Sequence, residues 1–172
     1  AGAEIGENVS LGAYSIVGKG VKIGDGTRIA NHVSITGRVT IGKNCWIKSG
    51  AVLGEEGFGF EENENGEWEH FPHIGETVIG DRVFIGANST VEQATLDCTT
   101  ICDGVVIDDL TQVGHNTHIG KNALIACGAV ICGGAEIGEN CWIAPNVSVR
   151  EKVKVGDRAL VGLGSVVVKD VP

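Results

Sequence analysis

Methionine is absent from this chain of 172 residues, which also contains only 3 Pro, 3 Trp, 4 Phe and 1 Tyr. Together with 27 Gly, these counts disfavour a helical bundle and favour a fold with many tight backbone corners. Hydrophobic residues still make up 42% of the chain, which is enough for one domain with a sizeable core. We therefore expect residues 1–172 to form a single domain.

Basic residues are scarce too, with 13 Lys and Arg against 22 Asp and Glu and a formal net charge of -9. Proteins hold nucleic acid phosphates with clustered Lys and Arg, so we expect no nucleic acid partner. No apolar run approaches the roughly 20 residues that span a bilayer. Residues 1–10 lack the basic start and apolar centre of a signal peptide. We therefore expect an unprocessed cytoplasmic protein without a membrane span.

The six cysteines form no C-x-x-C pair, and several stand at positions where other repeats have Ala or Val. This pattern favours small buried hydrophobes over metal ligands and agrees with a reducing compartment. The residues concerned are Cys45, Cys98, Cys102, Cys127, Cys132 and Cys141.

An aliphatic residue recurs every six positions over most of the chain, and the residue after it is Gly in 13 of 24 hexads. A second small or β-branched residue lies two positions earlier, which is the period of a strand with one buried face. The aliphatic positions are Ile5, Leu11, Val17, Ile23, Ile29, Ile35, Ile41, Ile47, Leu53, Ile79, Ile85, Val91, Ile101, Ile107, Val113, Ile119, Ile125, Ile131, Ile137, Ile143, Val149, Val155, Val161 and Val167.

Each hexad therefore predicts one short strand and one turn, with the glycine after the aliphatic residue suited to a tight corner. Three such strands wound into a triangular coil bury their faces together, so 24 hexads predict an all-β parallel β-helix of about eight coils. An amphipathic helix fits poorly, because its apolar positions recur with a period near 3.6.

Two interruptions of the repeat, at about residues 54–76 and 92–100, are the informative places. A filled prism has no interior cavity, so ligands must bind outside it. The first excursion contains Gly57-Phe58-Gly59-Phe60 and an acidic tip, residues 61–69, which we interpret as a solvated loop. Its aromatic residues either anchor the excursion on the solenoid or cover a ligand.

The best catalytic candidate is His115, because imidazole is the side chain best matched to proton transfer near neutral pH. It falls two places after the interior residue Val113 and should face outward at a corner. Asp108 and Asp109 lie about one side earlier, so either would orient the imidazole only from a neighbouring side or chain. Isolated surface histidines are usually inert, so this position alone predicts little.

A zinc site built from His70, His73, His115 and His118 is the competing hypothesis. Related β-helix carbonic anhydrases use a His pair five apart on one strand, whereas His115 and His118 are three apart. We therefore expect no metal.

Four of the 13 basic residues, Arg150, Lys152, Lys154 and Arg158, fall within nine positions. They form either a solvated face or a site for the phosphates of coenzyme A or of phosphopantetheine on acyl carrier protein.

Several segments together resemble the UDP-3-O-acylglucosamine N-acyltransferases of lipid A synthesis, and the match covers most of the chain. They are Gly57-Phe58-Gly59-Phe60, Gly66-Glu67-Trp68, Pro72-His73-Ile74-Gly75, Ile79-Gly80-Asp81, Ile85-Gly86-Ala87-Asn88-Ser89-Thr90 and Gln112-Val113-Gly114-His115-Asn116.

The resemblance implies a left-handed β-helix and a homotrimer with active sites between adjacent subunits. It also implies His115 as general base for N-acylation of a nucleotide-linked amino sugar, and a backbone N–H that stabilises the oxyanion. The residues expected to bind the acceptor are Phe58, Phe60, His73, Gln112 and Asn116, and those expected to bind the donor are Gly133, Arg150, Lys152 and Lys154. The co-substrate is acyl carrier protein or coenzyme A as a thioester, with no permanently bound cofactor.

Three departures from that family leave the donor and the acceptor open. The repeats begin at residue 3 and follow the chain to its last residues, so the family's N-terminal uridine-binding domain and C-terminal helical extension are not seen. The family's second active-site histidine aligns with Glu151-Lys152. Residues 161–172 resemble acetyl-coenzyme A-dependent acetyltransferases, which favours an N-acetyltransferase for surface polysaccharide as the alternative. A non-catalytic β-helix platform is a further alternative.

Overall fold

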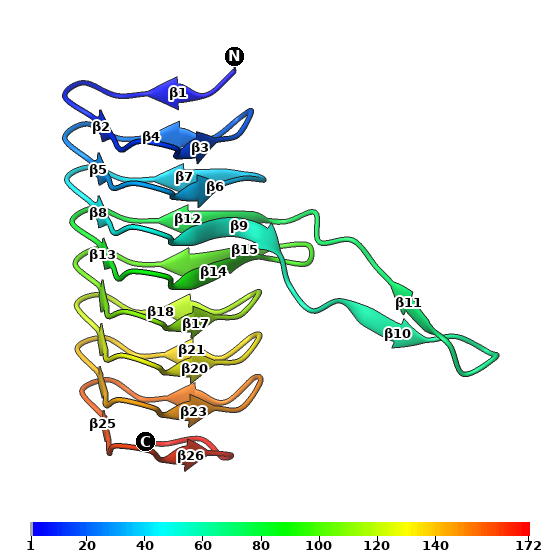
Figure 1. The fold of residues 1–172 in the computed structure, drawn as a ribbon. Helices are drawn as coiled ribbons and strands as arrows, with labels where there is room; N and C mark the ends of the chain where they lie inside the picture. The colour runs from blue at the N-terminus through cyan, green and yellow to red at the C-terminus, as the bar shows by residue number, and fades with distance from the viewer. Residues whose placement is uncertain (1) are drawn as a thin grey trace.

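The structure is a computed structural model that describes residues 2–172, and 24 of its 26 strands wind into a three-sided solenoid (Figure 1). Each side is a parallel sheet of eight strands. The first sheet contains β1 (Glu4–Ile5), β4 (Lys22–Ile23), β7 (Val39–Ile41), β12 (Glu76–Ile79), β15 (Cys98–Ile101), β18 (His118–Ile119), β21 (Glu136–Ile137) and β24 (Lys154–Val155).

The second sheet contains β2 (Ser10–Leu11), β5 (Arg28–Ile29), β8 (Trp46–Ile47), β13 (Phe84–Ile85), β16 (Val106–Ile107), β19 (Leu124–Ile125), β22 (Trp142–Ile143) and β25 (Leu160–Val161). The third contains β3 (Ile16–Val17), β6 (Ser34–Ile35), β9 (Val52–Glu56), β14 (Thr90–Gln93), β17 (Gln112–Val113), β20 (Val130–Ile131), β23 (Ser148–Val149) and β26 (Val166–Val167).

All 24 aliphatic positions of the repeat lie in these 24 strands, so the hexad pattern predicts every strand of the solenoid. Eight strands on each side correspond to eight turns, and a bridge between Val155 and Val171 begins a ninth. None of residues 2–172 lies in a helix, and none of the described chain forms a helix long and apolar enough to cross a membrane.

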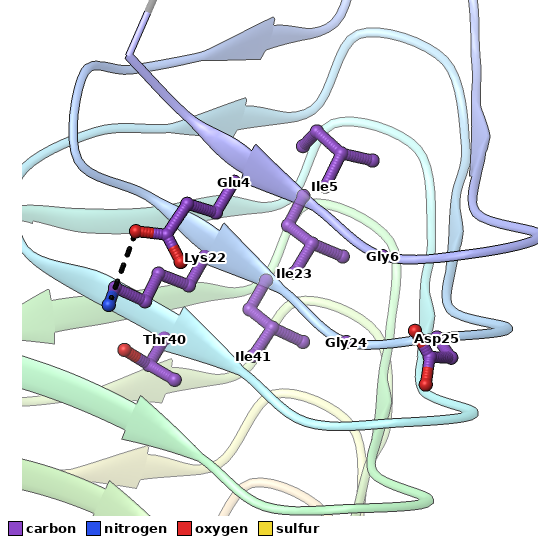
Figure 2. A pocket seen from close by; sticks show the side chains of 9 residues that line it. All are labelled: Glu4, Ile5, Gly6, Lys22, Ile23, Gly24, Asp25, Thr40 and Ile41. Atoms are coloured by element: carbon purple, nitrogen blue, oxygen red, sulfur yellow. Dashed lines mark ion pairs between the residues drawn. The ribbon is translucent and has the colours of Figure 1, made fainter.

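The interior consists of ladders of aliphatic side chains that stack from turn to turn. Figure 2 shows Ile5, Ile23 and Ile41 one above another, while Glu4 and Lys22 project outward and form an ion pair of 3.3 Å. Ile23 and Ile41 are buried, whereas Ile5 is 44% exposed at the open end of the solenoid. Burying a side chain of this size contributes about 1.5–3 kcal/mol, so these ladders stabilise the stack.

The glycine that follows the aliphatic residue does not form the corner, contrary to our expectation. Apart from Gly54, none of these glycines has a positive φ. A β-carbon at Gly12 would lie 2.3 Å from the carbonyl carbon of Ala30, and one at Gly86 would lie 2.3 Å from that of Asp108. These positions require glycine because the backbone of the next turn approaches too closely for a side chain.

The left-handed corner residue lies two positions further along, where Asn is common. Asn44 and Asn122 both have φ 55°, and even Leu110 has φ 59° at the equivalent place. This is the third position of a type II turn, which requires a positive φ. Asp and Asn side chains add hydrogen bonds between turns: Asp25 Oδ1, for example, accepts the N–H of Glu7, one turn earlier in the sequence, at 2.9 Å.

Both interruptions of the repeat fall at one edge of the prism, where the chain passes from the third sheet to the first. We call this the histidine edge; it comprises residues 36–39, 54–76, 94–97, 114–117, 132–135 and 150–153. Between β9 and β12 the chain leaves the edge as an antiparallel hairpin, β10 (Phe60–Glu62) and β11 (Trp68–His70), which projects away from the solenoid (Figure 1).

Candidate active site

His115 lies on the histidine edge in the turn that follows β17, where the regular spacing of the repeat places its side chain outside the prism. Its imidazole Nδ1 is 3.1 Å from Asn116 Oδ1, which also accepts the backbone N–H of Thr95 at 3.0 Å. Because a backbone N–H only donates, the amide oxygen of Asn116 must face both groups. The neutral His115 ring therefore carries its proton on Nδ1, and Nε2 has a free lone pair.

The imidazole ring of His115 packs on Gly133, one turn further along the solenoid. A β-carbon at Gly133 would lie 2.6 Å from Nε2, 2.7 Å from Cε1 and 3.0 Å from Cδ2, so only glycine leaves room for the face of the ring. Among residues 2–172, no acceptor pairs with the backbone N–H of Gly133. A proton acceptor and an unpaired backbone donor thus lie side by side on adjacent turns.

Glu92 is the acid at this site, and it is not among the residues predicted from the sequence. Its Oε2 accepts the backbone N–H of His115 at 3.0 Å, and its Oε1 accepts Gln112 Nε2 at 3.2 Å. Glu92 begins the second interruption, where the six-residue spacing is lost and no longer predicts which way a side chain points. One feature of the sequence could have identified it: Glu92 directly follows the interior residue Val91, a position where most hexads have Gly.

The two aspartates closest in sequence to His115 act elsewhere. Asp109 accepts Lys48 Nζ at 2.7 Å and the backbone N–H of Ala87 at 2.6 Å. These hydrogen bonds lower the pKa of Asp109 below its usual value, with that from Lys48 contributing most. Asp108 accepts the N–H of Asp109 at 2.8 Å. Both aspartates stabilise a different corner of the solenoid.

His73 contacts the imidazole of His115. The two ring centroids are 5.0 Å apart in an edge-to-face arrangement, and His73 also stacks on Phe71. His73 is only 2% exposed, and neither ring nitrogen has a hydrogen-bond partner among residues 2–172. Burial lowers the pKa of His73 below its usual value, and the neighbouring His115 lowers it further. Gln93 Nε2 anchors the segment by donating to the His73 carbonyl at 2.7 Å.

The Gly57-Phe58-Gly59-Phe60 segment alternates between two faces. A β-carbon at Gly57 would lie 2.7 Å from Glu92 Oε2 and 3.0 Å from His115 Cδ2, and one at Gly59 would lie 2.6 Å from His73 Cε1. The two glycines thus allow the backbone at the base of the hairpin, which we call the hairpin root (residues 57–59 and 71–73), to lie flat on the two imidazoles.

The aromatic residues of the same segment face away from His115. Phe58 is 81% exposed and its ring lies 5.3 Å from that of Phe60. Together with Trp68 they line an apolar hollow on the hairpin. The structure therefore brings His73, Gln112, Asn116 and Gly133 to His115, but holds Phe58 and Phe60 on a separate surface.

The predicted donor residues are divided in the same way. Arg150 and Lys152 lie on the histidine edge two turns beyond His115, roughly 10 Å away at the usual strand spacing. A β-carbon at Gly134 would lie 3.3 Å from Lys152 Cγ, so the Lys152 stem lies over the turn next to His115. Lys154 lies on the first sheet and pairs with Glu136 at 2.9 Å, which raises the pKa of Lys154.

Other surface depressions lie away from this edge. Figure 2 shows one on the first sheet, over the first three turns, formed by residues such as Glu4, Lys22 and Thr40. It contains no histidine or cysteine. In the described part of the chain, no three His, Cys, Asp or Glu side chains are grouped to hold a metal ion.

Models of two repeat families match this sequence. The model described as bacterial transferase hexapeptide (six repeats) matches residues 2–37, 98–133 and 134–169, which is more than half of the chain. The chain belongs to the bacterial transferase hexapeptide repeat family. A second model, described as hexapeptide repeat of succinyl-transferase, matches residues 76–108.

Curated relatives of this hexapeptide protein are named UDP-3-O-acylglucosamine N-acyltransferase. That of Coxiella burnetii is 37% identical over 134 residues, which covers 67% of this chain and 39% of the relative. That of Pseudomonas putida is 44% identical over 104 residues, covering 60% of this chain and 29% of the relative. The chain therefore spans less than half the length of the relatives it matches.

Solved structures with the same fold include UDP-N-acetylglucosamine acyltransferase of Francisella novicida, with a TM-score of 0.90 and 26% identity over 99% of this chain and 60% of that one. LpxA of Acinetobacter baumannii superposes with a TM-score of 0.89 and 25% identity over 99% and 64% of the two chains. The predicted left-handed parallel β-helix of hexapeptide repeats is confirmed.

Proposed function

We propose that this hexapeptide protein transfers an acyl group from a thioester donor to the amine of a nucleotide-linked amino sugar, with His115 as general base. The observation that carries the proposal is the environment of the imidazole: Asn116 Oδ1 faces Nδ1, Nε2 makes no hydrogen bond among residues 2–172, and the ring lies over the side-chain-free turn at Gly133. The names of the relatives from Coxiella burnetii and Pseudomonas putida support a UDP-linked acceptor, as in lipid A synthesis.

The reaction follows from this geometry. The sugar amine attacks the thioester carbonyl carbon while its proton passes to Nε2 of His115, and the carbonyl oxygen becomes an oxyanion. We propose that the N–H of Gly133 stabilises that charge. When the tetrahedral intermediate collapses, the carbon–sulfur bond breaks, and the departing thiolate takes the proton back from Nε2. The products are an amide and a free thiol, and His115 is regenerated.

The acceptor and the donor approach this centre from two directions along the histidine edge. The hairpin, with Phe58, Phe60 and Trp68, lies on the side of the earlier turns and is proposed to cover the acceptor. Lys152 and Arg150 lie on the side of the later turns and are proposed to bind the phosphates of coenzyme A or of the phosphopantetheine on acyl carrier protein. Because Glu136 already pairs with Lys154, Lys152 is the stronger candidate for this contact.

The test is a thioester assay that offers acetyl-coenzyme A and acyl carrier protein donors against UDP- and dTDP-linked amino sugars. His115→Ala should lower turnover by about 10²-fold or more, the usual contribution of a general base. His118→Ala is the matched control, because His118 is exposed on the outer face of the first sheet. If His115→Ala retained the wild-type rate, the mechanism would be wrong. Preference for acetyl-coenzyme A would favour the N-acetyltransferase alternative.

We further propose that three copies assemble around a threefold axis, in a cytoplasmic enzyme. The outer face of the second sheet supports this, because it carries an exposed apolar ladder. The ladder comprises Trp46, Phe84, Val106, Leu124, Trp142 and Leu160, which lie next to one another on consecutive turns.

A further inference from the structure

His73 is the one described side chain with buried nitrogen or oxygen atoms that have no hydrogen-bond partner. Buried polar groups in folded proteins are nearly always paired, and each exception calls for a physical explanation. Both imidazole nitrogens of His73 are buried. The backbone around Gly59 lies against Cε1 and Nδ1 of the ring, and Phe71 stacks on it. A ligand therefore cannot reach these nitrogens while the hairpin root is in place.

The His73 ring packs between two other rings, that of Phe71 and the imidazole of His115, whose centroid lies 5.0 Å away in an edge-to-face arrangement. This edge-to-face arrangement is the geometry that aromatic rings prefer, and it constrains the orientation of both rings. The orientation of His115 decides whether Nδ1 reaches Asn116, so the contact with His73 bears directly on the free lone pair of Nε2.

The charge of His73 matters as much as its shape. Four titratable groups surround its ring: Glu56 on β9, Glu92 on β14, His70 on β11 and His115 in the turn after β17. Burial and the two histidines favour the neutral form, and they outweigh the two carboxylates. A general base becomes cationic for part of each turnover, and a second cation beside it would oppose that step.

We propose that His73 is a positioning residue for His115: its ring, packed edge to face against the imidazole of the base, fixes the orientation in which Nδ1 reaches Asn116. The inference rests on the proposed function for its catalytic consequence. It also makes the hairpin root a structural link between the acceptor-covering hairpin and the base. His73 itself touches no reacting atom.

Three substitutions of His73 distinguish the effect of its ring shape from the effect of its nitrogens. His73→Phe keeps an uncharged ring of similar shape and should keep turnover within about threefold of wild type. His73→Ala and His73→Gln remove the ring and should lower kcat by roughly 10²-fold, the scale of a displaced catalytic group, with KM changed much less. His118→Gln is the control, because His118 is exposed on the outer face of the first sheet and is not among the groups that act on His73.

Two further readouts would not respond to a merely structural role. Nitrogen-15 spectra of the ligand-free protein should show the Nδ1-protonated tautomer of His115 in wild type and His73→Phe, and a mixture of tautomers in His73→Ala. The acid limb of log kcat/KM against pH should be steeper in wild type than in His73→Phe, because burial lowers the pKa of His73 and only a protonated His73 adds a second positive charge beside the base.

The proposal is overturned if His73→Phe loses as much turnover as His73→Ala, because the nitrogens would then be required. It is also overturned if His73→Ala retains both the wild-type kcat and the His115 tautomer. The spectra need no substrate, so they separate this proposal from the proposed function. An inactive wild type whose His115 tautomer still depends on the His73 ring would contradict the reaction and leave the positioning role standing.

Discussion

At the scale of single residues, Asn116 shows how one side chain satisfies both the fold and the site. Its φ of 58° is the left-handed corner conformation of the repeat, which Asn tolerates better than most residues. Its Oδ1 also accepts the backbone N–H of Thr95 and faces Nδ1 of His115. Asparagine at this position is therefore explained in part by the turn alone, and only substitution separates the two roles.

Asn116→Gly keeps the left-handed backbone and removes the acceptor, so it should lower turnover about tenfold or more because the His115 tautomer is no longer fixed. Loss of the hydrogen bond from Thr95 should reduce the free energy of unfolding by about 1 kcal/mol, measured in urea. The matched control is Asn122→Gly, at a corner with φ 55° and away from His115. Equal activity in the two variants would mean that Asn116 serves only the turn.

At the scale of elements, the 24 strands were predictable and the hairpin root was not. A hexad fixes which side chains point inward, because each turn repeats the geometry of the last. The segments at 54–76 and 92–100 have no such phase, so the sequence did not indicate that Gly57 lies on His115 or that Glu92 accepts its N–H. The His115 side chain itself was predictable because its turn keeps the regular spacing.

Gly57→Ala tests whether the hairpin root must lie flat on the base. The new methyl group would sit 2.7 Å from Glu92 Oε2 and 3.0 Å from His115 Cδ2, so the hairpin or the imidazole must shift. We expect kcat to fall roughly tenfold or more. The control is Gly162→Ala, where the nearest atom to the new methyl group is 3.7 Å away and φ is not positive. Wild-type kcat in Gly57→Ala would contradict the close contact.

At the scale of the whole molecule, one face of the prism differs from the other two. The outer ladder of the second sheet is almost wholly apolar, with Trp142 52% and Leu160 67% exposed. The first sheet instead exposes charged pairs such as Glu136 and Lys154 on the same turns. Exposed apolar surface of this extent usually marks a contact between proteins, and most soluble assemblies are closed rings of identical subunits.

Trp142→Glu places a carboxylate in the middle of that ladder and should convert the proposed trimer to monomers, because a charge buried in an apolar interface lacks a partner. Light scattering at micromolar concentration measures the mass directly. Thr40→Glu, on the exposed face of the first sheet, is the control and should leave the trimer intact. Circular dichroism should report the same β-rich spectrum for both variants, since neither side chain lies in the interior. If Trp142→Glu remained trimeric while Thr40→Glu dissociated, the first sheet would be the interface instead.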